Sequence, residues 1–133
     1  MTVSELVDAY YATWRNGIAT FDEAGLRALL ADDFVYNGPI AGRRPGMESF
    51  VQGLKNFVRT LVQLRVLSRL EGGDEAALLY DCDLSQPSGT FRFAEFLRVG
   101  DGKIHEVRLV FDATEFRKLA PPAATAPSER VTS

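Results

Sequence analysis

The 133-residue sequence is poor in the residues that build disulfide and metal sites. Its one cysteine can form neither an internal disulfide bond nor a site with several thiolate ligands. Its one histidine stands among scattered carboxylates, which is a weak pattern for a metal site. No phosphate-binding glycine loop, nucleophile elbow or dinucleotide motif occurs. We therefore expect no metal and no cofactor.

Basic side chains and long apolar runs are also scarce. The 15 lysines and arginines are outnumbered by 18 aspartates and glutamates, which gives a net charge of −3. Nucleic-acid-binding surfaces need a basic excess to neutralise phosphates, so we expect no nucleic-acid partner. No apolar run reaches the roughly 20 residues of a membrane-spanning helix. The segment MTVSELVDAY at the start lacks the features of a secretory signal, and we expect a cytoplasmic location.

What is present is the composition of an ordinary globular domain, with 46% hydrophobic and 25% charged residues. The length fits one domain. After residue 119 the sequence consists mainly of proline, alanine, serine and threonine and loses its periodicity. We expect one domain over residues 1–119 and a flexible C-terminal tail over residues 120–133.

Hydrophobic periodicity predicts helices in the first half of the chain and strands in the second. Apolar residues spaced by three to four predict helices over residues 3–15, after Asp22 and from Met47. Thr2 and Glu5 form the pattern of a capping box before the first helix. Alternation predicts strands over residues 34–37, 64–70, 76–84, 91–99 and 104–111. The short turns between them predict an α+β fold, a curved antiparallel sheet with helices on one face.

Four segments in this order carry a family resemblance: residues 10–14 (YYATW), 29–35 (LLADDFV), 42–43 (GR) and 97–104 (LRVGDGKI). Together they resemble the nuclear-transport-factor-2-like superfamily, in its SnoaL-like and ketosteroid-isomerase-like branch. The resemblance implies a cystatin-like α+β roll over residues 6–116, in which the sheet wraps around the helices and encloses a conical pocket. It also implies a small apolar or aromatic ligand and a homodimer through the outer sheet face. The fold hosts isomerases, cyclases, hydrolases and non-catalytic binders, so it does not choose among them.

The alternation of side chains along the strands predicts which residues line that pocket. Pairing across the turn at residues 100–102 places positions 91, 93 and 95 opposite 111, 109 and 107, on one mostly apolar face. We expect this face to be concave. The aromatic residues expected to contact a substrate are Trp14, Tyr36, Phe57, Tyr80, Phe93 and Phe111.

Glu95 is the anomaly on this face, because burying an unpaired carboxylate costs several kcal/mol. It is either a structural residue, exposed at an edge or paired with an arginine, or a pocket acid whose pKa is raised by burial. The resemblance favours the second interpretation. Ketosteroid-isomerase-like members carry a buried acid that donates to an oxyanion at the place of Glu95, and its partner tyrosine at the place of Tyr10. Glu95 and Tyr10 are therefore the candidate catalytic residues, and removing so poorly paired an acid is expected to leave the fold unharmed or firmer.

Other polar residues limit the chemistry. The resemblance places the general base of the isomerases at position 38, where this sequence has Gly38. His105 is expected on the concave side near the turn, where a lone histidine is usually a surface or hydrogen-bonded residue. The sequence also contains residues for an Asp–Arg–Asp set, which resembles the water-activating trio of limonene-epoxide-hydrolase-like members. The alternation directs all of these residues to the outer face: Asp81, Asp83, Arg108 and Asp112.

Two functions remain open. The first is a small-molecule-binding SnoaL-like protein, an isomerase, cyclase or hydrolase that acts on an apolar carbonyl-bearing or polycyclic substrate with Glu95 as the pocket acid. The second is a non-catalytic ligand-binding or dimerisation module of the same fold, which the glycine at position 38 favours. In either case the outer face mixes Phe96 and Val110 with arginines, which suits a homodimer interface.

Overall fold

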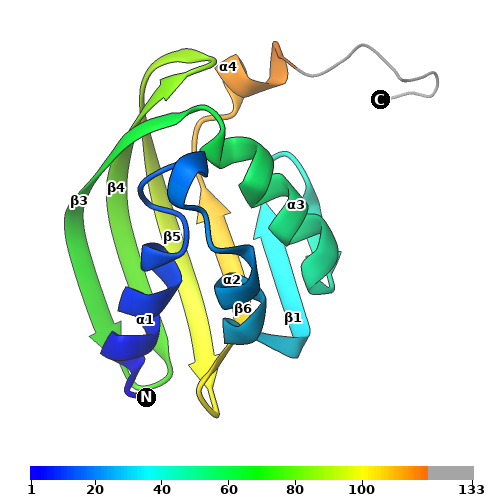
Figure 1. The fold of residues 1–133 in the computed structure, drawn as a ribbon, viewed down its shortest axis with the longest axis vertical. Coiled ribbons are helices and arrows are strands. Elements are labelled where there is room, and N and C mark those ends of the chain that lie inside the picture. Colours follow the sequence, from blue (N-terminus) through cyan, green and yellow to red (C-terminus); the bar gives the residue numbers. More distant parts are fainter. Residues whose placement is uncertain (120–133) are drawn as a thin grey trace.

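A six-stranded curved sheet forms the main layer of the computed structural model, which describes residues 1–119 (Figure 1). The strands are β1 (Leu30–Gly38), β2 (Gly42–Pro45), β3 (Leu61–Gly72), β4 (Glu75–Ser85), β5 (Ser88–Gly100) and β6 (Lys103–Val110). They lie in the order β2-β1-β6-β5-β4-β3, and all neighbours are antiparallel except β1 and β6. The predicted α+β class is confirmed, with one parallel pair in the sheet. The tail expected over residues 120–133 lies outside the described residues.

Three helices cover one face of the sheet (Figure 1). They are α1 (Val3–Ala12), α2 (Glu23–Leu29) and α3 (Met47–Val58), with a short 3-10 turn, η1 (Ile18–Thr20), between the first two. A single turn of helix, α4 (Thr114–Arg117), follows the sheet at the other end of the described chain. None of the helices within residues 1–119 is long and apolar enough to cross a membrane.

The helix starts follow the predicted caps. The hydroxyl of Thr2 accepts a hydrogen bond from the Glu5 amide at 3.1 Å, and the Glu5 carboxylate accepts one from the Thr2 amide at 2.8 Å. Asp22 caps α2 by accepting from the Gly25 amide at 2.9 Å. These bonds satisfy amides that the first helical turn leaves without partners.

Element ends differ from the prediction where local hydrogen bonds or pairing override periodicity. Helix α1 ends at Ala12 rather than near residue 15, since the Thr13 hydroxyl donates to the Tyr10 carbonyl at 2.6 Å and the Thr13 carbonyl accepts from the Asp22 amide at 2.9 Å. Strand β1 begins at Leu30, four residues early, because Leu30 pairs with Ile104 of β6. Strand β2 was not predicted, since all four of its residues are exposed and give no alternation.

The β5–β6 hairpin corrects the predicted register. Its turn is Asp101-Gly102, with φ of +54° and +71°, so Gly100 rather than Val99 lies opposite Lys103. A bulge one residue further moves Glu95 opposite Leu109 instead of residue 107. The total shift is two residues, so each β5 side chain keeps its predicted face.

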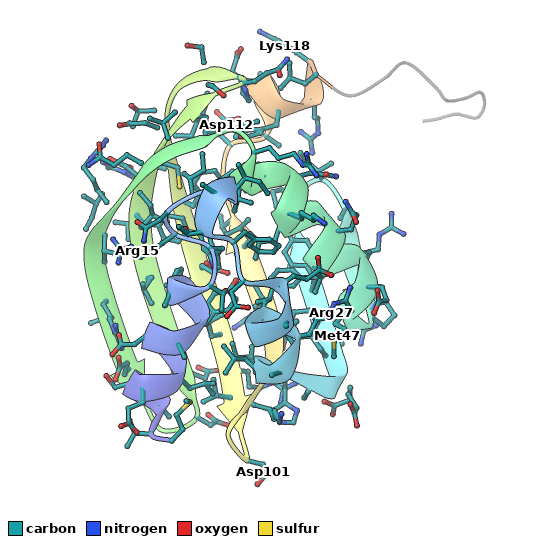
Figure 2. The ribbon with its side chains drawn as sticks, viewed as in Figure 1. Arg15, Arg27, Met47, Asp101, Asp112 and Lys118 are labelled. Atoms are coloured by element: carbon teal, nitrogen blue, oxygen red, sulfur yellow. The ribbon has the colours of Figure 1, made fainter. Side chains whose placement is uncertain are left out.

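The core lies between the helices and the concave face, where the side chains in Figure 2 converge. Asp101 marks one end of the molecule, at the tip of the β5–β6 hairpin, and Asp112 and Lys118 lie toward the other end, near α4 (Figure 2). The largest fully buried side chains of the core include Trp14, Tyr10 and Phe34.

Candidate functional site

A cavity of about 440 Å³ opens between the concave face of the sheet, α1, α3 and α4. The structure places all six predicted aromatic residues on its wall, together with both predicted catalytic residues. The wall consists of Tyr10, Trp14, Tyr36, Ile40, Ala41, Arg44, Ser49, Phe50, Gly53, Leu54, Phe57, Tyr80, Phe93, Glu95, Leu109, Phe111 and Phe116. The cavity is large enough for a small organic molecule.

The aromatic side chains support one another around this cavity. The Tyr80 and Phe93 rings, opposite each other on β4 and β5, stack with centroids 5.6 Å apart. Phe93 also meets Phe57 of α3 edge-on at 5.7 Å and Phe111 at 5.1 Å. Trp14 contacts Tyr80 edge-on at 6.0 Å. Such rings have few rotamers to lose, so the wall is held in shape without a ligand.

Glu95 is buried, 3% exposed, and accepts three phenol hydrogen bonds. The Tyr10 hydroxyl donates to Oε2 at 2.6 Å, whereas those of Tyr11 and Tyr80 donate to Oε1 at 2.6 and 2.8 Å. Tyr10 and Tyr11 come from α1, and Tyr80 comes from the neighbouring strand β4. No arginine takes part, so the structural alternative of an exposed or arginine-paired glutamate is wrong.

The environment of Glu95 shifts its protonation equilibrium toward the neutral form, relative to an exposed carboxyl group. Burial raises the pKa of Glu95 above the ordinary carboxyl value, and the three phenol hydrogen bonds lower it without cancelling the effect of burial. Burial, followed by the nearby Glu95 charge, holds the pKa of Tyr10, Tyr11 and Tyr80 well above 10. The phenols therefore stay protonated and can only donate to an ionised Glu95.

Tyr11 is a hydrogen-bond partner of Glu95 that sequence reasoning missed. It lies next to Tyr10 and is only 4% exposed, and its ring meets the Tyr10 ring edge-on, with the ring centroids 4.8 Å apart. The available signal was the pair of adjacent tyrosines, since neighbours on a helix diverge by about 100° and so can approach one carboxyl group from two sides.

Tyr36 fills the space beside Gly38. A Cβ atom at Gly38 would collide with the Tyr36 hydroxyl, so the phenol lies where a side chain at position 38 would start. Burial and the Glu95 charge raise the pKa of Tyr36 to about 12. Its hydroxyl makes no hydrogen bond within residues 1–119, unlike those of the three phenols bound to Glu95. Tyr36 is thus a protonated donor on the cavity wall that is free for a ligand.

His105 does not face the cavity, which corrects its predicted placement. The bulge in the β5–β6 pair turns Ile104 into the core, and His105 beside it, at the hairpin end of β6, does not line the cavity. Its Nδ1 lies 2.8 Å from Asp33 Oδ1, and its Nε2 lies 3.0 Å from the Gly100 carbonyl oxygen. His105 is a half-buried, hydrogen-bonded residue outside the cavity wall.

The charged residues of the outer face pair with one another, away from the cavity. Asp81 accepts from Arg92 at 2.9 Å, and Asp83 accepts from Arg65 at 2.7 Å. Neither Arg108 nor either of these aspartates lines the cavity. The placement agrees with the alternation along the strands.

Known proteins with this architecture place the chain in a family. The SnoaL-like domain matches residues 7–107, more than half of the chain. A protein from Kribbella flavida of known crystal structure is 32% identical, with 86% of this chain and 89% of that chain covered and a TM-score of 0.74. A candidate ketosteroid isomerase from the same organism is 26% identical, with 97% and 89% covered and a TM-score of 0.67.

A more distant structure shares the fold alone: an LEH-like epoxide hydrolase from M. tuberculosis is 20% identical, with 86% and 85% covered and a TM-score of 0.65. No curated protein matches the chain in sequence. The family match and the 32% identical structure agree with the fold. The chain therefore belongs to the SnoaL-like domain family, within the nuclear-transport-factor-2-like superfamily.

Proposed function

We propose that the chain binds a small apolar molecule that bears a carbonyl group or is polycyclic, and that Glu95 acts on it as a proton donor. The reaction class is a cofactor-free isomerisation, cyclisation or hydrolysis. The observation that carries the proposal is a buried carboxyl group on the wall of a cavity that is otherwise mainly apolar and aromatic. Such a combination is typical of sites that bind small molecules by shape and orient them with a few polar groups.

The hydrogen bonds of Glu95 indicate which oxygen donates. Oε1 accepts from both Tyr11 and Tyr80, whereas Oε2 accepts from Tyr10 alone. Oε2 therefore has room for the proton of the neutral acid, and the phenols hold the carboxyl group in place. Tyr10 acts here as a positioning residue, since its own proton points at Glu95.

Two donors of the wall, the Glu95 carboxyl and the free Tyr36 hydroxyl, are available to a ligand oxygen. Both line the cavity. A donor that faces an oxygen on which negative charge develops lowers the barrier, because it is already oriented before the reaction starts. This supports reactions that begin by polarising a carbonyl group.

The cavity wall offers no second group for proton abstraction. Glu95 is its one carboxyl residue, and no histidine is among the lining residues of the described chain. Position 38, where the isomerases hold their base, is a glycine covered by Tyr36. This observation favours the second candidate function, a binding module that keeps the pocket but performs no proton transfer.

Binding of fluorenone, a rigid tricyclic ketone, tests the proposal. Trp14 is the single tryptophan and lines the cavity, so its fluorescence reports occupancy. We expect Glu95→Ala to weaken binding about two- to twelvefold, the equivalent of one net hydrogen bond of about 0.5–1.5 kcal/mol. Glu95→Gln should retain part of the affinity, because an amide N–H can still donate.

The matched control is Glu75→Gln, an exposed carboxylate of β4 that does not line the cavity. We expect this variant to bind fluorenone like the wild type. Equal fluorenone affinity in wild type and Glu95→Ala would contradict a role for Glu95. If the protein converts a ketone substrate and Glu95→Gln slows this turnover about 10²–10³-fold, the protein is an enzyme rather than a binding module.

We also propose that the outer sheet face forms a homodimer. Two neighbouring rows of apolar side chains run across the strands in the middle of this face. One row is Leu70, Ala77 and Phe96, and the other is Leu79, Ala94 and Val110. Phe96 is 40% and Val110 58% exposed. The ion pairs Asp81–Arg92 and Arg98–Glu106 border these rows. An apolar centre with a charged rim is the composition of a protein–protein interface.

A further inference from the structure

The cavity has one basic side chain, Arg44, on the short edge strand β2. Arg44 pairs with Tyr36 in the antiparallel β1–β2 ladder, and residues directly opposite each other point to the same side of a sheet. Because Tyr36 lines the cavity, Arg44 faces it too. The next pair, Asn37 with Arg43, points to the other side.

The guanidinium group of Arg44 is held in place without being neutralised. Its Nε–H donates to the Ala41 carbonyl oxygen at 3.0 Å, within the same hairpin. Within residues 1–119, no carboxylate lies at ion-pair distance from it, and its two terminal nitrogens make no hydrogen bond. This differs from Arg65 and Arg92 of the outer face, which are each paired with an aspartate. The terminal N–H groups of Arg44 are free to bind an oxyanion.

The polar groups of the cavity therefore lie on different elements, with apolar rings between them. Glu95 and its phenols are buried between α1, β4 and β5, whereas Arg44 is exposed on the edge strand. Ser49, also exposed on the first turn of α3, adds a hydroxyl to the wall. Aromatic and aliphatic side chains form most of the remaining wall.

We infer that Arg44 is the anchor for an anionic group of the ligand, so that the natural ligand is an apolar acid rather than a neutral compound. The apolar body occupies the aromatic wall, and a carboxylate or another oxyanion binds Arg44 at the cavity rim. A ligand bound the other way round would bring its anion to Glu95, where the same burial that disfavours ionised Glu95 disfavours a second anion. The acid end therefore stays outside and the neutral end reaches Glu95. This inference rests on the proposed function, since it concerns the ligand of the same cavity.

Naphthoate and its neutral amide, naphthamide, test the inference because they share one shape and differ in charge. We expect wild type to bind naphthoate more tightly than naphthamide by about threefold to tenfold, as for one charge-assisted contact at a partly exposed site. Arg44→Gln should remove this preference and leave naphthamide binding unchanged. Added salt should weaken naphthoate binding only while Arg44 is present.

Arg43→Gln is the matched control, since it removes the same charge from the neighbouring residue on the opposite side of β2. We expect it to leave both affinities as in wild type. Equal loss of naphthoate binding in Arg43→Gln and Arg44→Gln overturns the inference, because it indicates only a general effect of net charge. The inference also fails if wild type binds the two probes equally or binds neither. Neutral fluorenone tests the proposed function separately: Glu95-dependent fluorenone binding without a preference for naphthoate leaves that function standing.

Discussion

Three phenol hydroxyls surround Glu95 and replace the water that would hydrate a carboxylate at the surface. These hydrogen bonds change the effect on stability that we expect from removing the acid. The sequence suggested a poorly paired group whose loss leaves the fold unharmed, whereas Glu95→Ala leaves three buried donors without their acceptor. Each unsatisfied buried donor costs about 1–3 kcal/mol. We therefore expect Glu95→Ala to be destabilised, measurable as a lower midpoint in urea unfolding.

The raised pKa of Glu95 predicts how stability depends on pH. In the unfolded chain the carboxyl group titrates near its ordinary value of 4.5, and in the fold it holds its proton to higher pH. The stabilisation from neutral Glu95 is thus fully present below about pH 4.5 and is lost as the pH rises through the folded pKa. Calorimetric Tm values of wild type and Glu95→Gln, which cannot titrate there, should show the wild-type advantage shrinking with pH. An advantage that grows with pH would mean that the fold favours the anion.

Tyr36 provides a second prediction at the scale of one side chain. Because its hydroxyl has no protein partner within the described chain, Tyr36→Phe should fold with nearly unchanged Tm. The same change should weaken fluorenone binding about two- to twelvefold, the worth of one net hydrogen bond. Fluorene, the hydrocarbon with the same rings, is the control ligand and should not distinguish the two proteins. Unchanged fluorenone affinity would exclude Tyr36 as a ligand donor.

Among the elements, the first helix depends on its cap. Thr2→Ala removes the hydroxyl that accepts from the Glu5 amide, and loss of an N-cap costs about 0.5–2 kcal/mol. Tyr10 and Tyr11 lie on this helix, so fraying also loosens the shell around Glu95. We expect Thr2→Ala to lower the free energy of unfolding by that amount, as measured in urea. Thr2→Ser keeps the hydroxyl and should match wild type; equal losses in both variants would contradict the capping role.

The elements also show what the sequence could and could not predict. Caps and strand faces depend on neighbouring residues, so the Thr2–Glu5 box and the face of Glu95 followed from local patterns. Pairing across the sheet is not local. The register of β5 with β6 depends on a bulge that no pattern marked, and that bulge moved His105 out of the cavity. Strand β2 was missed because its four exposed residues give no alternation, and Arg44 was missed with it.

For the whole molecule, the apolar rows of the outer sheet face predict self-association. Phe96→Glu places a charge in the centre of this surface, opposite Arg108, whose guanidinium carbon lies 5.6 Å from the Phe96 ring centre. We expect wild type to sediment as a dimer at micromolar concentration and Phe96→Glu as a monomer with the same fold. An exposed charge elsewhere, such as Ala12→Glu on α1, should leave the dimer intact. A wild-type monomer at micromolar concentration would rule out this interface.

The central claim is that Glu95 is a neutral acid that donates to the ligand, and infrared difference spectroscopy of the carboxyl group tests it most directly. A protonated carboxyl has a C=O stretching band that a carboxylate lacks. We predict that this band persists in wild type above the pH range in which ordinary carboxyl groups ionise, and that Glu95→Gln lacks it. The band should move to lower frequency when fluorenone binds, because the acid then donates a new hydrogen bond. A wild-type spectrum without the band, or a band that fluorenone leaves unchanged, would contradict the account.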